Sequence, residues 1–175
     1  PSGPASLYLP VAVRRYPLEF LVDCGGDTPY RDSLGRLWLA DSAYSTGNWG
    51  YVGNTMVWST ARDIAGTNED RLYQTLRYGD GGSFGYRFDV PNGTYQVELH
   101  FAEIYMQRAG ARVFNVSIEG QTVLSNLDVF QQAGGGFQAL TRAFTVDVVD
   151  GQLNITFNRG IENPIINALR VTKVN

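Results

Sequence analysis

The sequence contains very little cysteine, lysine and histidine. Its 175 residues include one cysteine, Cys24, one histidine, His100, and one lysine, Lys173. A single cysteine excludes an intramolecular disulfide and a cysteine-rich metal site within this sequence. The remaining basic residues are arginines, the net charge is only -3, and no cluster is large enough to neutralise a phosphate backbone. The composition therefore argues against a nucleic-acid-binding protein.

Long hydrophobic runs are also missing. No apolar stretch approaches the roughly 18 residues that a membrane-spanning helix requires, so we expect no membrane association. The chain starts without a methionine or a signal-like segment, and we expect it to be one segment of a larger multidomain protein. Its length predicts a single domain over residues 17–175, preceded by a linker and a first strand that is poorly determined, over residues 1–16.

The set of reactive side chains gives little support for an enzyme. Strand alternation places His100 on the face opposite Val97, Leu99 and Phe101, so we expect it at the surface. A surface position of the single histidine argues against a serine triad, no spacing supports a dyad with Cys24, and the tetrahedral zinc pattern is absent. We therefore predict a protein without catalytic residues.

Several acidic residues remain as candidates for other roles, and Glu98, Asp128 and Glu162 are interpreted as surface or structural acids. Glu103 is different, because the inward phase of the preceding strand would bury its charge. A bulge near Ala102 or an arginine partner would resolve that conflict.

No cofactor is expected from the sequence. Oxygen ligands for a structural calcium ion stay open in the aspartate-containing loop with Asp27, Asp32 and Asp41, although no EF-hand pattern is present. The glycine-rich residues 79–85 lack the spacing of a phosphate-binding loop and predict a tight turn instead.

Alternation of apolar and polar residues with period two dominates the sequence. Each such segment predicts a half-buried strand, with inward residues Leu18, Phe20, Val22; Val97, Leu99, Phe101; Phe114, Val116, Ile118; Phe144, Val146, Val148; and Leu153, Ile155, Phe157. A helix has only weak support, over residues 69–78. Many short antiparallel strands predict an all-β fold, a jelly-roll β-sandwich with long aromatic-rich loops.

Turn residues separate these strands. Pro91-Asn92-Gly93 and Glu119-Gly120 mark two turns, and Asp150-Gly151 predicts a tight hairpin between the strands that flank it. Residues 27–66 form a long irregular region that contains all three tryptophans, Trp38, Trp49 and Trp58. We expect short strands within it, with the tryptophans mainly in a small satellite core and some tyrosines at a binding surface.

Six short motifs, taken in order, resemble malectin and the malectin-like domains, also called family 57 carbohydrate-binding modules. They are VDCGG (22–26), LYQTLRYG (72–79), FGYRFDVPNGTYQVELHFAEIY (84–105), RVFNVSIEG (112–120), NLDVF (126–130) and IENP (161–164), the last followed by INALRV. The resemblance covers residues 18–174. It implies a jelly-roll lectin-like domain without enzymatic activity.

The resemblance also implies a set of sugar-binding residues. A tyrosine that ends the LYQT motif corresponds to Tyr78, and an aromatic pair after FAE corresponds to Tyr105 and Met106. An acid in the Asp-Asn-Pro turn of the family corresponds to Glu162, and a tyrosine in the first long loop to Tyr51. Aromatic rings would cover the apolar face of a sugar, and the acid would accept hydrogen bonds from its hydroxyl groups.

The function that the resemblance implies is recognition of glucose-containing oligosaccharides, of the α-linked maltose or nigerose type, by an extracellular or cell-surface module. Met106 replaces an aromatic residue, which leaves a second hypothesis open: a structural or adhesive β-sandwich that mediates protein contacts without binding sugar.

Overall fold

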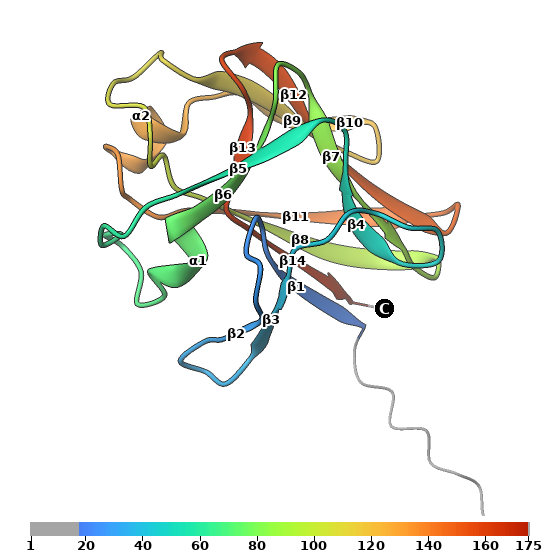
Figure 1. Ribbon diagram of the computed structural model, residues 1–175. Helices are drawn as coiled ribbons and strands as arrows, with labels where there is room; N and C mark the ends of the chain where they lie inside the picture. Colours follow the sequence, from blue (N-terminus) through green and yellow to red (C-terminus); the bar gives the residue numbers. More distant parts are fainter. Residues whose placement is uncertain (1–17, 175) are drawn as a thin grey trace, which may run out of the picture.

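The computed structural model describes residues 18–174 and shows an all-β sandwich (Figure 1). One sheet has six strands, in the order β11 (Leu140–Val148), β8 (Gly93–Phe101), β14 (Ala168–Lys173), β1 (Glu19–Asp23), β3 (Leu37–Ala40) and β2 (Tyr30–Arg31). The predicted linker and first strand over residues 1–16 lie outside the described residues.

The second large sheet has five strands, and a smaller sheet of three strands crosses one side of the sandwich (Figure 1). The five-stranded order is β10 (Gln121–Leu127), β9 (Val113–Ile118), β12 (Gln152–Ile161), β7 (Phe84–Asp89) and β4 (Trp49–Val52). The three-stranded order is β13 (Ile165–Ile166), β6 (Thr75–Gly79) and β5 (Thr55–Ser59). Two short helices, α1 (Arg71–Gln74) and α2 (Val129–Ala133), complete the described elements.

The core lies between the two large sheets, where the alternating apolar residues meet. The predicted inward residues of β8, β9 and β12 are all essentially inaccessible to solvent. Phe101 of β8 and Phe114 of β9 contact each other across the sandwich, with ring centroids 6.1 Å apart. Cys24 is fully buried as well, and burial raises the pKa of its thiol, so it acts as a small apolar core residue.

Pairing is antiparallel with one exception among the ladders. β1 and β3 run parallel, with Val22 opposite Leu39 and Asp23 opposite Ala40. The prediction of a sandwich of antiparallel strands is therefore confirmed for the architecture and corrected at this one pair. The residues between β1 and β3 include β2, and their return path allows β3 to align with β1 in the same direction.

The two acidic-glycine turns differ in what they connect. Glu119 and Gly120 have φ angles of 50° and 73° and close a hairpin between β9 and β10, which is the geometry of a tight turn. The predicted Asp150-Gly151 hairpin is wrong, because β11 pairs with β8 whereas β12 pairs with β7 and β9. Gly151 has a φ of 83°, and this positive angle lies in the turn where the chain passes from β11 in one sheet to β12 in the other.

The weak helix prediction over residues 69–78 holds for one turn only. Helix α1 ends at Gln74, and β6 begins at Thr75. β6 pairs with β5 on one side and β13 on the other, and these pairings override the weak helical pattern.

The long region over residues 27–66 is confirmed to contain short strands, namely β2, β3, β4 and β5. Its tryptophans do not behave alike. Trp38 is buried and its indole N–H donates to Asp32 Oδ2 at 3.0 Å, and Trp49 stacks on Phe88 with ring centroids 6.0 Å apart. Trp58 is 47% exposed, so the satellite-core prediction is wrong for this residue.

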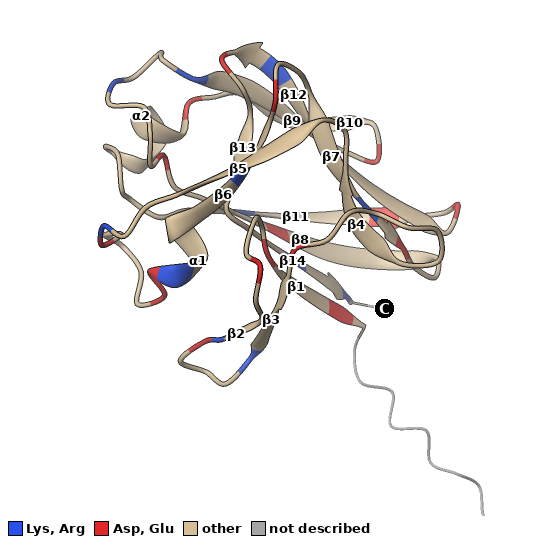
Figure 2. Ribbon diagram, viewed as in Figure 1, with Lys and Arg blue, Asp and Glu red and all other residues tan. Residues whose placement is uncertain are grey.

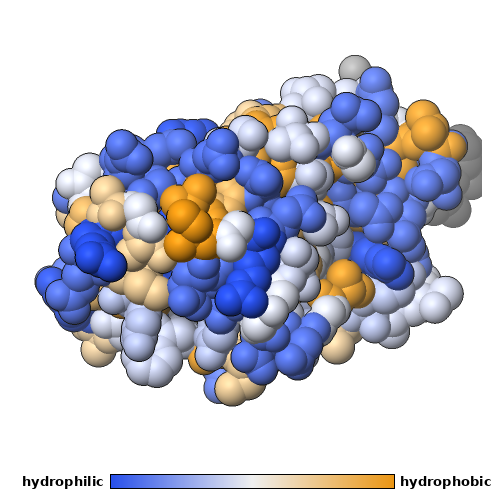
Figure 3. All heavy atoms as spheres, turned by 90° about the horizontal axis from the view of Figure 1, so that it is seen from above, coloured by the Kyte–Doolittle hydropathy of each residue, from blue (hydrophilic) through white to orange (hydrophobic). Residues whose placement is uncertain are grey.

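Charged residues of both signs are interspersed over the fold (Figure 2). The face seen in Figure 3 is largely hydrophilic, with hydrophobic side chains in separate small patches. Among residues 18–174, no helix has the length and apolar character that crossing a bilayer would require.

Candidate functional site

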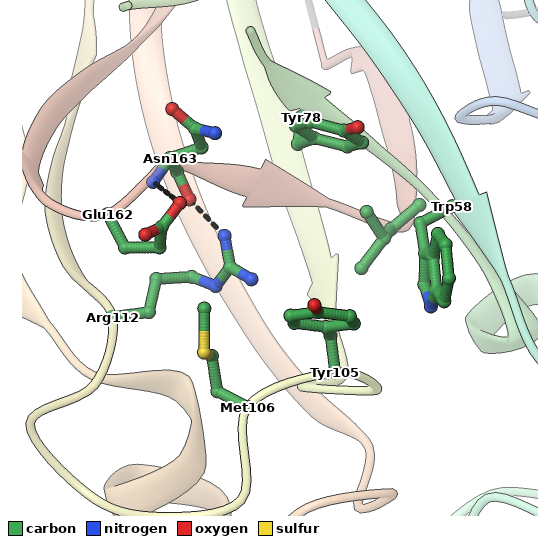
Figure 4. A pocket seen from close by; sticks show the side chains of 8 residues that line it. Trp58, Tyr78, Tyr105, Met106, Arg112, Glu162 and Asn163 are labelled. Carbon is green, nitrogen blue, oxygen red and sulfur yellow. Dashed lines mark hydrogen bonds between the residues drawn. The ribbon is translucent and has the colours of Figure 1, made fainter. Parts of the chain in front are cut away.

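A pocket of about 230 Å³ opens beside the three-stranded sheet (Figure 4). Three walls form it: the paired strands β5 and β6, the chain between β8 and β9, and the turn that follows β12. The pocket is lined by Trp58, Leu76, Tyr78, Tyr105, Met106, Arg112, Glu162 and Asn163. Its size is below the roughly 300–1,000 Å³ of drug-sized sites, so it would enclose only part of a long ligand.

Strands β5 and β6 supply the first wall through their alternation. Trp58 pairs with Leu76 across the ladder, and Tyr78 lies two residues further along β6 on the same face. Leu76 is buried, Tyr78 is half-buried and Trp58 is exposed. The wall therefore offers aromatic surface above an apolar base.

The other face of β6 carries Arg77, which fixes this sheet to the sandwich. Its Nε donates to Asp41 Oδ2 at 2.6 Å, and the same oxygen accepts from the Tyr86 hydroxyl at 2.8 Å. Burial lowers the pKa of Arg77, but the Asp41 carboxylate outweighs this effect and raises it. The guanidinium therefore stays charged, and Tyr78 is presented by a strand that is held from behind.

The second wall follows β8, which ends at Phe101. Glu103 is 1% exposed, and its Oε1 accepts hydrogen bonds from the backbone N–H groups of Tyr105 and Met106, at 3.0 and 2.8 Å. Its Oε2 accepts from Arg112 Nε at 2.7 Å. The expected arginine partner of Glu103 is thereby confirmed. The carboxylate shapes the turn that places Tyr105 at the pocket with 57% of its surface exposed.

The third wall is the turn at Glu162 and Asn163. Glu162 has a φ of 62°, a left-handed conformation that is uncommon for a residue with a side chain. Its Oε1 accepts from the backbone N–H of Asn163 at 3.2 Å, and Arg112 Nη1 donates to the Asn163 carbonyl oxygen. Asn163 Oδ1 in turn accepts from Gly81 N at 3.2 Å, so this turn is tied to the loop after β6.

Four of the five residues predicted to bind sugar line this one pocket: Tyr78, Tyr105, Met106 and Glu162. Tyr51 does not line it. Its ring lies on β4 under the guanidinium of Arg77, 3.5 Å from the carbon of that group to the ring centroid.

Sequence reasoning missed Trp58, Arg112 and Asn163 as pocket residues. Trp58 stands edge-on to Tyr105, with ring centroids 5.3 Å apart at an interplanar angle of 83°. The sequence TMVWS has three consecutive apolar residues and no alternation, so it gave no signal that Trp58 would lie next to Tyr105. Arg112 was anticipated only as an unspecified partner for Glu103.

His100 is not a surface residue, which corrects the prediction from alternation. Its side chain is 13% exposed, Tyr73 OH lies 2.9 Å from its Nδ1, and Trp38 packs edge-on at 5.6 Å. The outer face of the six-stranded sheet is covered here by side chains from other elements. A side chain that points away from the core, such as His100, is therefore not exposed to solvent. Glu98 does lie beside it, with Oε2 3.7 Å from Nε2.

Two of the three aspartates considered for calcium, Asp32 and Asp41, are engaged with protein groups. Asp32 receives hydrogen bonds from Arg36 and Trp38, and Asp41 receives them from Arg77 and Tyr86. Within residues 18–174, no group of three acidic, histidine or cysteine side chains is placed to hold a metal ion.

The pocket thus combines three kinds of groups. Trp58, Tyr78 and Tyr105 offer aromatic surface, Glu162 offers a carboxylate, and Arg112 offers a guanidinium. A ligand with an apolar face and a rim of hydroxyl groups has matching features.

The model of the Malectin domain matches residues 18–169. The chain belongs to the malectin family. Malectin-B of Xenopus laevis is 32% identical over 142 residues, which is 71% of this chain and 50% of that protein. A probable leucine-rich-repeat receptor-like serine/threonine-protein kinase of Arabidopsis thaliana is 26% identical over 200 residues, covering 92% of this chain and 19% of the kinase. The chain therefore spans about half the length of malectin-B and a smaller part of the plant receptor.

Solved structures with the same fold belong to larger proteins. A beta-glucuronidase of Bacteroides uniformis superposes with a TM-score of 0.81 at 29% identity, over 90% of this chain and 18% of that enzyme. The ANX2 ectodomain from Arabidopsis thaliana superposes with a TM-score of 0.73 over 89% of this chain and 49% of that chain. At 21% identity the second likeness concerns the fold alone. Domains with this fold thus occur as parts of larger proteins with different overall roles.

Proposed function

We propose that this malectin-family chain is a non-catalytic carbohydrate-binding module that recognises glucose-containing oligosaccharides, of the α-linked maltose or nigerose type. The observation that carries the proposal is the convergence of Tyr78, Tyr105 and Glu162 from three distant segments on one pocket. These are the residues that the resemblance to malectin assigns to sugar binding.

The roles follow from the chemistry of a pyranose ring. The rings of Trp58, Tyr78 and Tyr105 would cover its apolar C–H faces, and Met106 would adapt to the remaining apolar edge. The free part of the Glu162 carboxylate would accept from sugar hydroxyl groups, in charge-assisted hydrogen bonds. The small volume of the pocket supports capture of a terminal or short unit and leaves the rest of a glycan in solvent.

The arrangement of the acids supports binding without hydrolysis. A glycosidase needs two carboxyl groups free to act on the scissile bond. Glu103 is buried, and both of its oxygens already accept hydrogen bonds from Arg112 and from backbone amides. Among residues 18–174, this leaves Glu162 as the one carboxylate that lines the pocket, which is insufficient for the two-carboxylate mechanism.

The setting that we propose is an extracellular or cell-surface protein of several domains, in which this module brings the remainder to a glycan. The chain matches only part of the length of each relative, and this supports a modular role.

A glycan array tests the proposal. Wild-type protein is compared with Tyr78→Ala and Tyr105→Ala on maltose, nigerose, longer α-glucans, β-glucans and galactans. Tyr44→Ala is the matched control, because Tyr44 bonds Asp89 and does not line the pocket. We expect glucose-terminated α-glucans to bind wild type and the control but neither pocket variant. Binding that survives in both pocket variants, with their fold intact, would contradict this site.

A second candidate function, protein contact without sugar binding, is favoured by one feature. β5 is an edge strand of the three-stranded sheet, and its residues Met56, Val57 and Trp58 are 52%, 41% and 47% exposed. An exposed apolar edge can pair with a strand of another protein. A blank array, together with a partner whose binding is lost in Val57→Lys, would favour this candidate.

A further inference from the structure

Arg112 is a buried cation in the wall of the pocket. The residue is 6% exposed, yet it is one of the eight that line the cavity. A guanidinium has five N–H donors in a rigid plane, so one such group can bond partners in several directions at once. How these donors are used decides whether Arg112 only supports the pocket or also meets a ligand.

Two of its three nitrogens are directed to protein acceptors. Nε donates to Glu103 Oε2 at 2.7 Å, and Nη1 donates to the carbonyl oxygen of Asn163. These bonds tie the Tyr105 wall to the Glu162 turn and fix the plane of the guanidinium. Its orientation is therefore set before any ligand arrives.

The third nitrogen, Nη2, has no hydrogen-bond partner within residues 18–174, and it is reached by solvent. Figure 4 shows this end of the guanidinium directed into the space between the rings of Tyr78 and Tyr105. A donor held at that place faces the region that a bound ring would occupy.

The charges around this donor add up to an excess of one negative charge. Glu103 and Glu162 contribute two carboxylates, and Arg112 contributes one guanidinium, so the sum is 1 − 2 = −1. Glu103 already neutralises Arg112 through their buried ion pair. An additional carboxylate on a ligand would therefore meet a cation whose charge is already balanced, together with the unpaired charge of Glu162.

We propose that Arg112 contacts the ligand and that, with Glu162, it makes the pocket selective for neutral sugars over sugars that carry a carboxylate. This inference rests on the proposed carbohydrate-binding function. A sugar hydroxyl group can accept from Arg112 Nη2, and a neighbouring hydroxyl can donate to Glu162, so a neutral diol satisfies both groups. A uronic acid offers no donor from its carboxylate and brings a like charge close to Glu162.

The test compares two ligands that differ only in this group. One is a maltose-type or nigerose-type disaccharide, and the other carries a carboxylate in place of the terminal hydroxymethyl group. Their affinities are measured by calorimetry on wild type, Arg112→Gln, Arg112→Lys, Glu162→Gln and the control Asp147→Asn, an exposed carboxylate on β11 that does not line the pocket. Far-ultraviolet circular dichroism and thermal melts report the fold of each variant.

We expect wild type and the control to bind the neutral sugar about tenfold or more tightly than the acidic one, the size of a modest like-charge penalty. Glu162→Gln should narrow this ratio, because it removes the repulsion while keeping the shape. Arg112→Lys should fold, since it keeps a positive charge beside Glu103, but it should weaken neutral-sugar binding about tenfold because an ammonium lacks the planar fork. Arg112→Gln should weaken it at least as much.

Three outcomes overturn the inference. One is equal or tighter binding of the acidic sugar by wild type. Another is unchanged neutral-sugar affinity in a folded Arg112→Lys or Arg112→Gln variant, which would reduce Arg112 to a structural role. The third is absence of binding by either sugar, which overturns the proposed function and this inference with it, whereas the first two leave the proposed function standing.

Discussion

The indole of Trp58 stands edge-on to the phenol ring of Tyr105, with ring centroids 5.3 Å apart, although the two residues are far apart in the sequence. Trp58 comes from the edge strand β5, and Tyr105 from the turn after β8. Both rings remain about half exposed, which is unusual for large aromatic side chains that already touch each other. The pair forms one rim of the pocket.

Replacement of Trp58 by alanine should weaken sugar binding without unfolding the protein. The indole is 47% exposed, so its removal leaves no large internal cavity. We expect about a tenfold loss in affinity, or about 1.4 kcal/mol, since part of an aromatic surface would no longer be buried by the ligand. Calorimetric titration with maltose and nigerose measures the loss. Val57→Ala on the same strand is the control, because Val57 is exposed and does not line the pocket; equal losses in both variants would contradict the role of Trp58.

Replacement of Glu103 by glutamine should destabilise the whole domain. The change leaves Arg112 buried without its counter-charge, and breaking a buried ion pair from one side typically costs about 3 kcal/mol or more. Urea denaturation measures this loss. It should also weaken sugar binding, because the single acceptor oxygen of a glutamine cannot serve both Arg112 and the backbone N–H groups of Tyr105 and Met106.

The matched control for Glu103 is Glu19→Gln. Glu19 forms an ion pair with Arg170 at 2.8 Å, but both side chains are more than a quarter exposed, 28% and 27%. A pair in that position should contribute less than about 1 kcal/mol. Similar losses of unfolding free energy in the two variants would refute the structural importance assigned to the buried pair.

Stability should fall as the pH rises from about 4 to about 7 because of Asp23. Burial raises the pKa of Asp23 to about 7, against a weaker opposing effect of Arg71. Its Oδ1 is buried without a hydrogen-bond partner among the described residues. The folded chain therefore keeps a proton that the unfolded chain releases near pH 4, and its advantage is complete at low pH and lost as the pH passes the folded pKa.

Asp23→Asn should remove this pH dependence, because the amide stays neutral. The wild-type loss attributable to Asp23 between pH 4 and 8 should amount to a few kcal/mol, at most about 4 kcal/mol for a three-unit difference in pKa. Urea denaturation at pH 4 and pH 8 compares the two proteins. Parallel changes in unfolding free energy for wild type and variant would show that Asp23 is not the source.

Tyr51→Ala should lower stability and leave sugar affinity unchanged. The ring supports the guanidinium of Arg77 at 3.5 Å and packs against the core, whereas the pocket is lined by other residues. We expect a loss of about 2 kcal/mol in unfolding free energy, from the lost cation–π contact and packing. The measurements are urea denaturation and titration with the same disaccharides. A drop in affinity comparable to that of Tyr78→Ala would instead place Tyr51 at the ligand.

The strands could be predicted because their evidence is local. Val97, Leu99 and Phe101 alternate with polar residues, and this pattern alone specifies an extended segment with one buried face. The need for a partner at Glu103 could also be predicted, because the alternation of the preceding strand directs its charged side chain toward the core. Tyr78, Tyr105, Met106 and Glu162 came from the resemblance to malectin, and their convergence was not visible in any local pattern.

The amino-acid sequence by itself determined the strands that alternate clearly, which of their residues face the core and to which family the chain belongs. The tertiary structure decided which strands are neighbours. Asp150-Gly151 has the same local chemistry in a hairpin and in a crossing between sheets, and only the pairing of β11 with β8 distinguishes them. His100 is covered, and Trp58 is brought to Tyr105, for the same reason: periodicity reports which way a side chain points, whereas exposure and contact depend on what the rest of the chain packs against it.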